Sequence, residues 1–386
     1  MIGKLILAAA AALALTGCAG HHAAVESPPP DFEHRIAGLM ASEHVNGMAV
    51  ALIDDGKVGY VHAFGARNEA GDPLGTDTVM YGASLTKTAF AYLVAQLAAE
   101  GAIDLDTPID HYLPRPLPDY AGEEDAYAPW QDLAGDERWR KLTPRILLNH
   151  GSGFANFYWL EDNEKLQFHF DPGTRFAYSG DGIILLQFVL ERGLGLDVQR
   201  EMDKRIFAPF GMTRSSLIWR DDFRSDLADG WTIDGKAVPH DDRSRVRAAG
   251  SLDTTIADMA RLAAGMMSGP ASLRDELFRP QLPIRSERQF PTLLPDAPAD
   301  RQTPGIAAGL GTVTFSGPQG RGFFKGGHDD STGNMLVCLE RGARCIVLLG
   351  NDVRAERIYP RIVALALGDT GMPWRWEYGR EPELSE

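Results

Sequence analysis

The chain has 386 residues, which is enough for one large domain or two smaller ones with a substantial core. Its hydrophobic fraction of 44% and charged fraction of 24% are those of an ordinary globular protein. The formal net charge is −15, and this argues against nucleic acid as a partner, because phosphate binding requires basic patches.

The N-terminus predicts an export signal. A basic start at Lys4 precedes an apolar stretch over residues 5–15, which is too short to span a bilayer. The end of this stretch, Leu15-Thr-Gly-Cys18, resembles a bacterial lipobox, in which Cys18 becomes the lipid-bearing first residue. Ordinary signal cleavage with an incidental cysteine is the alternative. We therefore expect a signal peptide over 1–17, a flexible spacer over 18–30, and a lipid anchor on Cys18 that tethers the protein in the bacterial cell envelope, at the outer membrane or a periplasm-facing membrane.

The first part of the mature chain predicts a helix, a hairpin and a second helix. Helical spacing of apolar residues extends over 31–43. Strands are expected over 48–53 and 58–64, because an Asp-Gly turn separates them. The helix that begins at Ser84 is apolar on every side and ends before Gly101, so it should be buried in the middle of a domain.

The remainder predicts a helical region followed by more strands. Helices are expected over 143–148, 183–190 and 255–267, a connecting segment over 280–304, strands over 310–315, 322–325, 335–339 and 345–349, and a closing helix over 355–367. The predicted fold class is α+β in three layers (α/β/α), with an antiparallel sheet built from both termini (31–104 and 305–386) and a mostly helical inserted domain (105–304).

Cys338 and Cys345 flank a turn at residues 340–343 and could face each other across two strands. An oxidising compartment permits a disulfide there. A two-residue turn at Arg341 and Gly342 would make them a hydrogen-bonded pair, whose wider spacing suits a bridge less well. We therefore predict two buried thiols.

Ser84 and Lys87 lie three residues apart and so share one face at the first turn of the buried helix. A lysine at such a place is costly unless it is paired or takes part in chemistry. A serine hydroxyl is a poor nucleophile until a base removes its proton, and Lys87 can do this if burial and nearby positive charge lower its pKa. The Ser-x-x-Lys spacing alone is a weak signal.

Further segments in the expected order make the signal specific. With them, the chain resembles the serine beta-lactamase and penicillin-binding protein superfamily in its class C-like branch, which includes class C beta-lactamases, D,D-peptidases, D-aminopeptidases and family VIII-type carboxylesterases. The segments are Ser84-Leu-Thr-Lys87, Leu105-Asp-Thr-Pro108, Leu142-Thr-Pro-Arg-Ile-Leu-Leu-Asn-His-Gly-Ser-Gly-Phe154, Pro172-Gly-Thr-Arg-Phe-Ala-Tyr-Ser-Gly180, Ala249-Gly-Ser-Leu252 and Lys325-Gly-Gly327.

The resemblance implies roles for individual residues. Tyr178 would shuttle a proton between Ser84 and the leaving group. Lys325 would anchor a substrate carboxylate or polarise the tyrosine, and Gly327 would let the substrate approach the strand. His328 is the alternative cation, and Lys325 is favoured. In the favoured register, the backbone N–H groups of Ser84 and His328 would form the oxyanion hole.

One residue departs from the family pattern. Gly180 stands where the superfamily usually has an asparagine that binds the amide carbonyl of the substrate, and this puts strong beta-lactamase activity in doubt. Asp181 is expected to cap the following helix, and His150 to be structural. Trp374, Trp376 and Tyr378 are expected to pack on the domain.

We therefore predict a serine hydrolase that acts through an acyl-enzyme on an ester or amide and is carboxylesterase-like. A class C-like beta-lactamase, a D,D-peptidase or a D-aminopeptidase is one alternative, and a non-catalytic envelope lipoprotein that binds or senses is another. The expected partners are a small-molecule ester, lactam or peptide and a membrane, with no metal ion or organic cofactor.

Overall fold

The computed structural model describes residues 28–379. The predicted signal peptide, Cys18 and all but the last three residues of the spacer lie outside the described residues. Within 28–379, every helix is too short or too polar to cross a bilayer.

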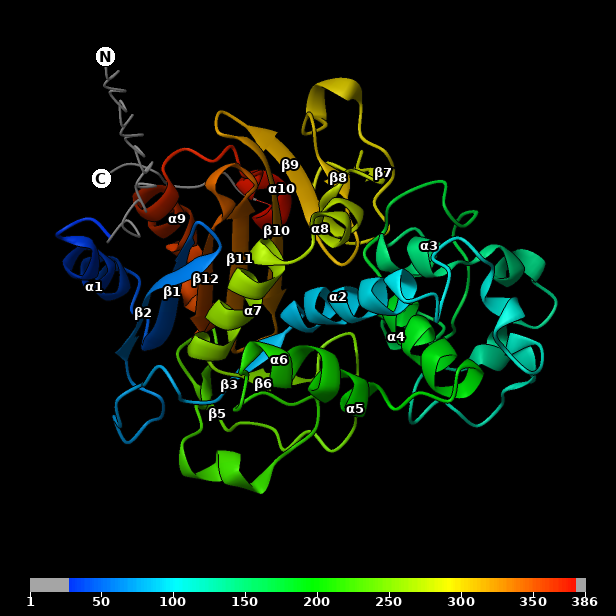
Figure 1. Cartoon of the computed structure of the whole chain (residues 1–386), viewed down its shortest axis with the longest axis horizontal. Helices are drawn as coiled ribbons and strands as arrows, with labels where there is room; N and C mark the ends of the chain where they lie inside the picture. Colours follow the sequence, from blue (N-terminus) through cyan, green and yellow to red (C-terminus); the bar gives the residue numbers. More distant parts are fainter. Residues whose placement is uncertain (1–27, 380–386) are drawn as a thin grey trace, which may run out of the picture.

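The centre of the molecule is an eight-stranded antiparallel sheet with the strand order β2-β1-β12-β11-β10-β9-β8-β7 (Figure 1). The N-terminal hairpin therefore pairs with the last strand of the chain, which confirms that both termini build the sheet. The strands are β1 (Gly47–Asp54), β2 (Lys57–Gly65), β7 (Leu282–Pro283), β8 (Ala307–Ala308), β9 (Val313–Gly317), β10 (Gly320–His328), β11 (Gly333–Leu339) and β12 (Arg344–Gly350).

Helices cover both faces of this sheet, which confirms the three-layer prediction (Figure 1). In β12, Val347 and Leu349 are buried with α2, whereas Ile346 and Leu348 are buried with α1 and α9. Side chains of both parities are apolar because each face needs a cover. The helices on one face are α1 (Phe32–Ser42), α9 (Tyr359–Leu367) and α10 (Trp374–Tyr378), and those on the other are α2 (Leu85–Ala99), α7 (Ile256–Ser268) and α8 (Ala271–Phe278).

A mostly helical region lies on the far side of α2 from the sheet (Figure 1). It includes α3 (Pro144–Leu148), α4 (Gly180–Phe188), α5 (Val198–Met202) and α6 (Ala208–Phe210). The small sheet of β3 (Met80–Ala83) and β6 (Leu252–Thr254) brings the middle of the chain to the start of α2. Helix α7, from the 105–304 range, packs against β1, β2 and β12, and the predicted domain boundaries stay predictions.

The segment 280–304 is more than the predicted connection, because Leu282 pairs with Ala308 and so adds β7 to the sheet. Pro283 is tolerated there because β7 is the edge strand, where a missing N–H breaks no ladder. Strand β10 is also longer than the predicted 322–325 and carries Gly327 and His328.

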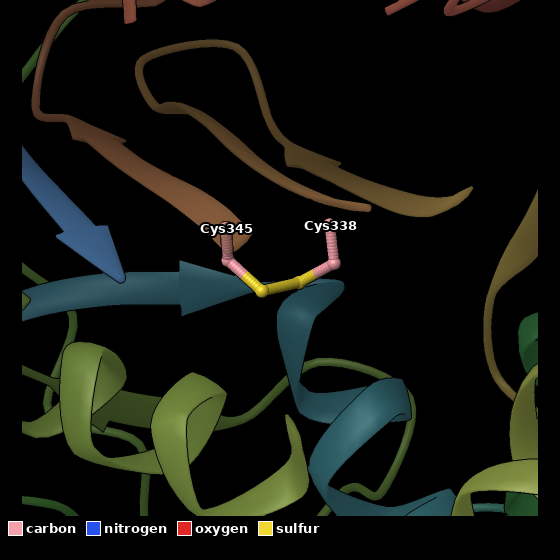
Figure 2. The surroundings of a disulfide bond; sticks show 2 residues. All are labelled: Cys338 and Cys345. Carbon is pink, nitrogen blue, oxygen red and sulfur yellow. A yellow bond between two sulfur atoms is a disulfide. The ribbon is translucent and has the colours of Figure 1, made fainter. Parts of the chain in front are cut away.

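The prediction of two free thiols is wrong, because Cys338 and Cys345 form a disulfide between β11 and β12 (Figure 2). The turn has four residues, with Ala343 N donating to Glu340 O at 3.1 Å, rather than two. The cysteines are direct partners with Cα atoms 4.1 Å apart, which is the close spacing of a pair without mutual backbone hydrogen bonds.

Candidate active site

Ser84 lies at the junction of β3 and α2, where the backbone is strained. Ala83 has φ of 46°, in the left-handed region that alanine rarely adopts. Ala83 O accepts from Thr86 Oγ1 at 2.5 Å, and Thr86 Oγ1 accepts from Leu252 N at 3.1 Å, which ties the turn to β6. The Ser84 side chain makes no capping bond to the described backbone of α2, so its Oγ is available to other side chains.

Lys87 is buried, with 1% of its surface exposed. Its Nζ donates to Ser84 Oγ at 2.9 Å and to Ala249 O at 2.5 Å. Burial lowers the pKa of Lys87; the neighbouring Tyr178 opposes this shift, and the positive charge of Lys325 adds to it. The first helical turn therefore brings an amine of reduced basicity to the serine.

Tyr178 reaches the same serine from the segment before α4. Its Oη donates to Ser84 Oγ at 2.9 Å and accepts from Lys325 Nζ at 3.1 Å. Burial by itself would raise the pKa of Tyr178, but the charges of Lys325 and Lys87 outweigh burial and lower it to about 7. A phenol in this position can accept and return a proton near neutral pH.

Of the two candidate cations in β10, Lys325 is the one in contact with Tyr178. Its Nζ is buried and also donates to Gly326 O at 2.8 Å. His328 instead lies 3.3 Å from a Glu356 oxygen through Nδ1, with 41% of its side chain exposed. The Glu356 carboxylate raises the pKa of His328 to about 9.

Gly327 allows β10 to approach the start of α2. A Cβ at this position would lie 3.0 Å from the backbone nitrogen atoms of Ser84 and Leu85. A larger residue would fill the space beside the Ser84 amide, where an oxyanion would have to bind. The role of the His328 amide in an oxyanion hole stays a prediction.

His150 supports Tyr178 from behind. Its Nδ1 accepts from Ser179 N at 3.2 Å, and its ring centroid lies 4.5 Å from that of Tyr178. Burial, together with the charges of Lys325 and Lys87, lowers the pKa of His150, so the ring is neutral. These contacts position the tyrosine.

The expected cap at Asp181 is wrong. Ser179 Oγ accepts from Gly182 N at 3.0 Å and so caps α4. The Asp181 carboxyl accepts from Tyr158 N at 2.6 Å, which fixes the loop before residue 160. Burial raises the pKa of Asp181 to about 8.

These groups open into a cavity of about 900 Å³ that has both apolar and polar lining residues. The Phe157 and Trp159 rings, stacked at 4.3 Å, form its aromatic wall. The other apolar lining residues include Leu160 and Phe290, and the polar ones include Arg243, Arg245, Arg247, Asp329, Asp330 and Glu377.

The ring of Phe157 occupies the space that a side chain at position 180 would need. A Cβ built on Gly180 would lie 2.2 Å from Phe157 Cε1, which is far inside van der Waals contact. The space beside Gly180, in the segment 172–180, is therefore filled by the ring of a residue 23 positions earlier in the chain. No spacing rule along the chain links these two positions.

Sequence reasoning missed Phe157 and Glu377 as cavity residues. Trp374 and Trp376 pack as expected, and both are buried. Glu377 stands next to them in α10, buried and lining the cavity. An acid in a short helix of buried aromatic residues was the available signal. Across residues 28–379, no cluster of His, Cys, Asp or Glu could hold a metal ion.

Comparisons with known proteins agree on one family. The family model described as Beta-lactamase matches residues 32–367. Monacolin J acid methylbutanoyltransferase of Aspergillus terreus is 27% identical over 321 residues, which are 69% of this chain and 75% of that protein. Lovastatin esterase of Penicillium rubens is 29% identical over 215 residues, which are 48% of this chain and 52% of that protein.

The same architecture occurs in a solved structure, the octameric penicillin-binding protein homologue from Pyrococcus abyssi. The TM-score is 0.68 at 21% identity, and the superposition covers 89% of this chain and 78% of the other. At this identity the likeness concerns the fold.

Proposed function

The chain belongs to the Beta-lactamase family of serine hydrolases and acyltransferases, and on that premise we propose that it is a carboxylesterase that works through an acyl-enzyme at Ser84. The contacts to Ser84 Oγ carry this proposal: Lys87 Nζ and Tyr178 Oη each lie 2.9 Å from it. A hydroxyl held between an amine and a phenol of lowered pKa has what a nucleophile requires.

The acylation step follows from these positions. Ser84 Oγ attacks the ester carbonyl carbon while its proton passes to the ionised Tyr178 Oη, which the Lys325 and Lys87 ammonium groups stabilise until then. The tetrahedral oxyanion forms beside the Ser84 amide. When the intermediate collapses, the C–O bond of the ester breaks and the departing alcohol takes the proton from Tyr178.

Deacylation uses the same groups in the reverse order. A water molecule attacks the acyl carbon and gives a proton to Tyr178 Oη. The bond to Ser84 Oγ then breaks, the proton returns to Ser84, and a carboxylic acid leaves. The proton that leaves Ser84 therefore has an acceptor at hydrogen-bond distance, and the same phenol serves the attacking water.

An ester is favoured over a beta-lactam or a peptide because of Gly180 and Phe157. In the superfamily the residue at this place binds the amide carbonyl of the substrate. Glycine offers no such donor, and the Phe157 ring fills the space. The aromatic wall suits a hydrocarbon acyl group instead. The signal peptide, the lipid anchor on Cys18 and the envelope location remain proposals that rest on residues 1–18.

Intact-mass labelling tests the proposal. We expect a fluorophosphonate and a short-chain nitrophenyl ester to add one phosphonyl or acyl mass to the wild-type protein and none to Ser84→Ala, with the ester turned over faster than nitrocefin or a D-Ala-D-Ala peptide. A folded wild-type protein that stays unlabelled would favour the non-catalytic alternative. Faster turnover of nitrocefin would favour the beta-lactamase alternative.

A further inference from the structure

Glu377 is a buried acid in the cavity that the reaction above does not use. It lies in α10 with 6% of its surface exposed, and it lines the cavity together with Lys325 and His328. Among the described residues its Oε2 has no hydrogen-bond partner. An unsatisfied buried carboxyl oxygen is costly, and the carboxyl group that carries it belongs to a residue that lines the cavity.

The carboxyl group is held in place by its neighbours. Trp376 is fully buried, its Nε1 donates to Ser286 Oγ at 3.2 Å, and its carbonyl accepts from Gln289 N at 2.9 Å. A Cβ on Gly326 would lie 2.1 Å from Glu377 Oε1, so the glycine provides the space that the carboxyl occupies. The hydrogen bonds of Trp376 hold α10 in place, and the missing side chain at Gly326 leaves room for the carboxyl group against β10.

The surrounding charges limit what can bind there. Burial raises the pKa of Glu377 to about 7, and the positive charges of Lys325 and His328 oppose this shift. At pH 8 the carboxylate is therefore ionised beside two cations. The two cations are balanced by Glu377 and by Glu356, which is paired with His328. A substrate ion of either sign therefore gains little there, whereas a neutral hydroxyl could donate to the Glu377 carboxylate without adding charge.

We place the alcohol portion of the ester on the β10 side of the cavity, because Tyr178, which gives its proton to the departing alcohol, accepts from Lys325 of β10. Glu377 lines the same cavity beside Gly326 of β10, and the aromatic wall remains for the acyl group.

We propose that Glu377 is a recognition residue that accepts a hydrogen bond from a hydroxyl group on the alcohol portion of the substrate, so that the enzyme prefers monoesters of diols or polyols. This inference rests on the proposed esterase function.

The test uses four butyrate esters that differ only in the alcohol: propyl, 3-hydroxypropyl, choline and 3-carboxypropyl. The value of kcat/KM is measured at pH 8 by titration of released butyric acid. We expect the wild type to prefer the hydroxypropyl ester over the propyl ester by about tenfold, because a hydrogen bond to a charged group is stronger than one to a neutral group. The choline and carboxypropyl esters should be slower than the hydroxypropyl ester.

Two variants of the acid give the readout. Glu377→Leu should bring the ratio of hydroxypropyl to propyl ester to within about twofold of unity, and Glu377→Gln, which keeps a neutral acceptor, should give an intermediate ratio. Glu69→Gln is the charge-matched control, because Glu69 is an exposed acid outside the lining of the cavity. We expect it to keep the wild-type ratio.

The outcomes separate the two proposals. If the wild type neither hydrolyses the propyl ester nor acylates Ser84, the esterase function itself fails. If the propyl ester is hydrolysed but the hydroxyl preference is absent, or persists in both Glu377 variants, or choline is the best alcohol, the assignment of Glu377 is wrong. Hydrolysis of the propyl ester by each variant shows that it is folded.

Discussion

Two sets of residues in the same cavity are built in different ways. The proposed catalytic cluster (Ser84, Lys87, Tyr178 and Lys325) is polar, lies largely buried and is joined by hydrogen bonds of 2.9 to 3.1 Å. The recognition residues (Phe157, Gly180 and Glu377) do not form such a network. Gly180 has no side chain, the Phe157 ring fills the space beside it, and Glu377 Oε2 has no hydrogen-bond partner among the described residues.

The difference shows which part of the site is free to change. Each residue of this cluster makes a hydrogen bond to another residue of the cluster, so the loss of one leaves a buried polar group without a partner. Phe157 and Glu377 line the cavity outside this hydrogen-bonded cluster, so either can change without leaving a member of the cluster unpaired. A common chemistry can therefore serve different substrates on this fold.

Removal of Lys87 or Tyr178 should have the largest effect. Lys87→Met and Tyr178→Phe are each expected to lower kcat/KM for a short-chain ester by about 10³-fold, because Tyr178 transfers the proton and the Lys87 charge keeps the phenol ionised. Steady-state hydrolysis measures the loss. Tyr112→Phe removes a tyrosine hydroxyl that accepts from Asp104 N outside the cavity and serves as the matched control. A Tyr178→Phe enzyme with wild-type activity would remove Tyr178 from the mechanism.

The pH dependence of kcat/KM tests how Lys325 acts on Tyr178. Because the ionised phenol is the active form, kcat/KM of the wild type should be low in acid and rise with pH through about 7, the pKa of Tyr178. Lys325→Met removes the charge that most lowers this pKa, so the rise should move upward by about one pH unit. Lys325→Arg keeps a positive charge and should bring the pH of the rise most of the way back to the wild-type value. A lower plateau with an unmoved rise would mean that Lys325 acts only in binding.

The smallest expected effect concerns the aromatic wall. Gly180→Asn alone should be destabilising, since its Cβ would lie 2.2 Å from Phe157 Cε1. In the double variant Phe157→Ala/Gly180→Asn the asparagine has space, and we expect benzylpenicillin to acylate Ser84 about fivefold faster than in the wild type. Urea unfolding and intact-mass time courses measure the two effects. Equal destabilisation by Gly180→Asn with and without Phe157 would contradict the steric account.

The catalytic cluster was largely accessible from sequence, with the help of family motifs. Ser84 and Lys87 are one helical turn apart, so their proximity is local. Tyr178 and Lys325 lie 94 and 241 residues from Ser84, and the family resemblance, rather than any periodicity, identified them. Lys325 was favoured over His328, and the structure places Lys325 against Tyr178. Gly180 was noted as a departure from the family pattern, whereas Phe157 and Glu377 were not found, because neither belongs to a motif.

Local errors had local causes. The thiol prediction assumed a two-residue turn, and a four-residue turn changes the type of the cysteine pair. Strand β7 was missed because Pro283 reads as a strand breaker, although an edge position tolerates it. Asp181 and Ser179 are both capping residue types, and only the backbone conformation decides which of them caps α4.

By itself, the sequence determined the α+β class, the buried helix of Ser84 and the approximate ranges of most strands, because each follows from the polarity of residues close together in the chain. The tertiary structure alone decided that the Phe157 ring replaces a side chain at Gly180, that Glu377 meets β10 at Gly326, and that two ammonium groups lower the pKa of one phenol. These depend on distances between segments that are remote in sequence, and packing sets such distances.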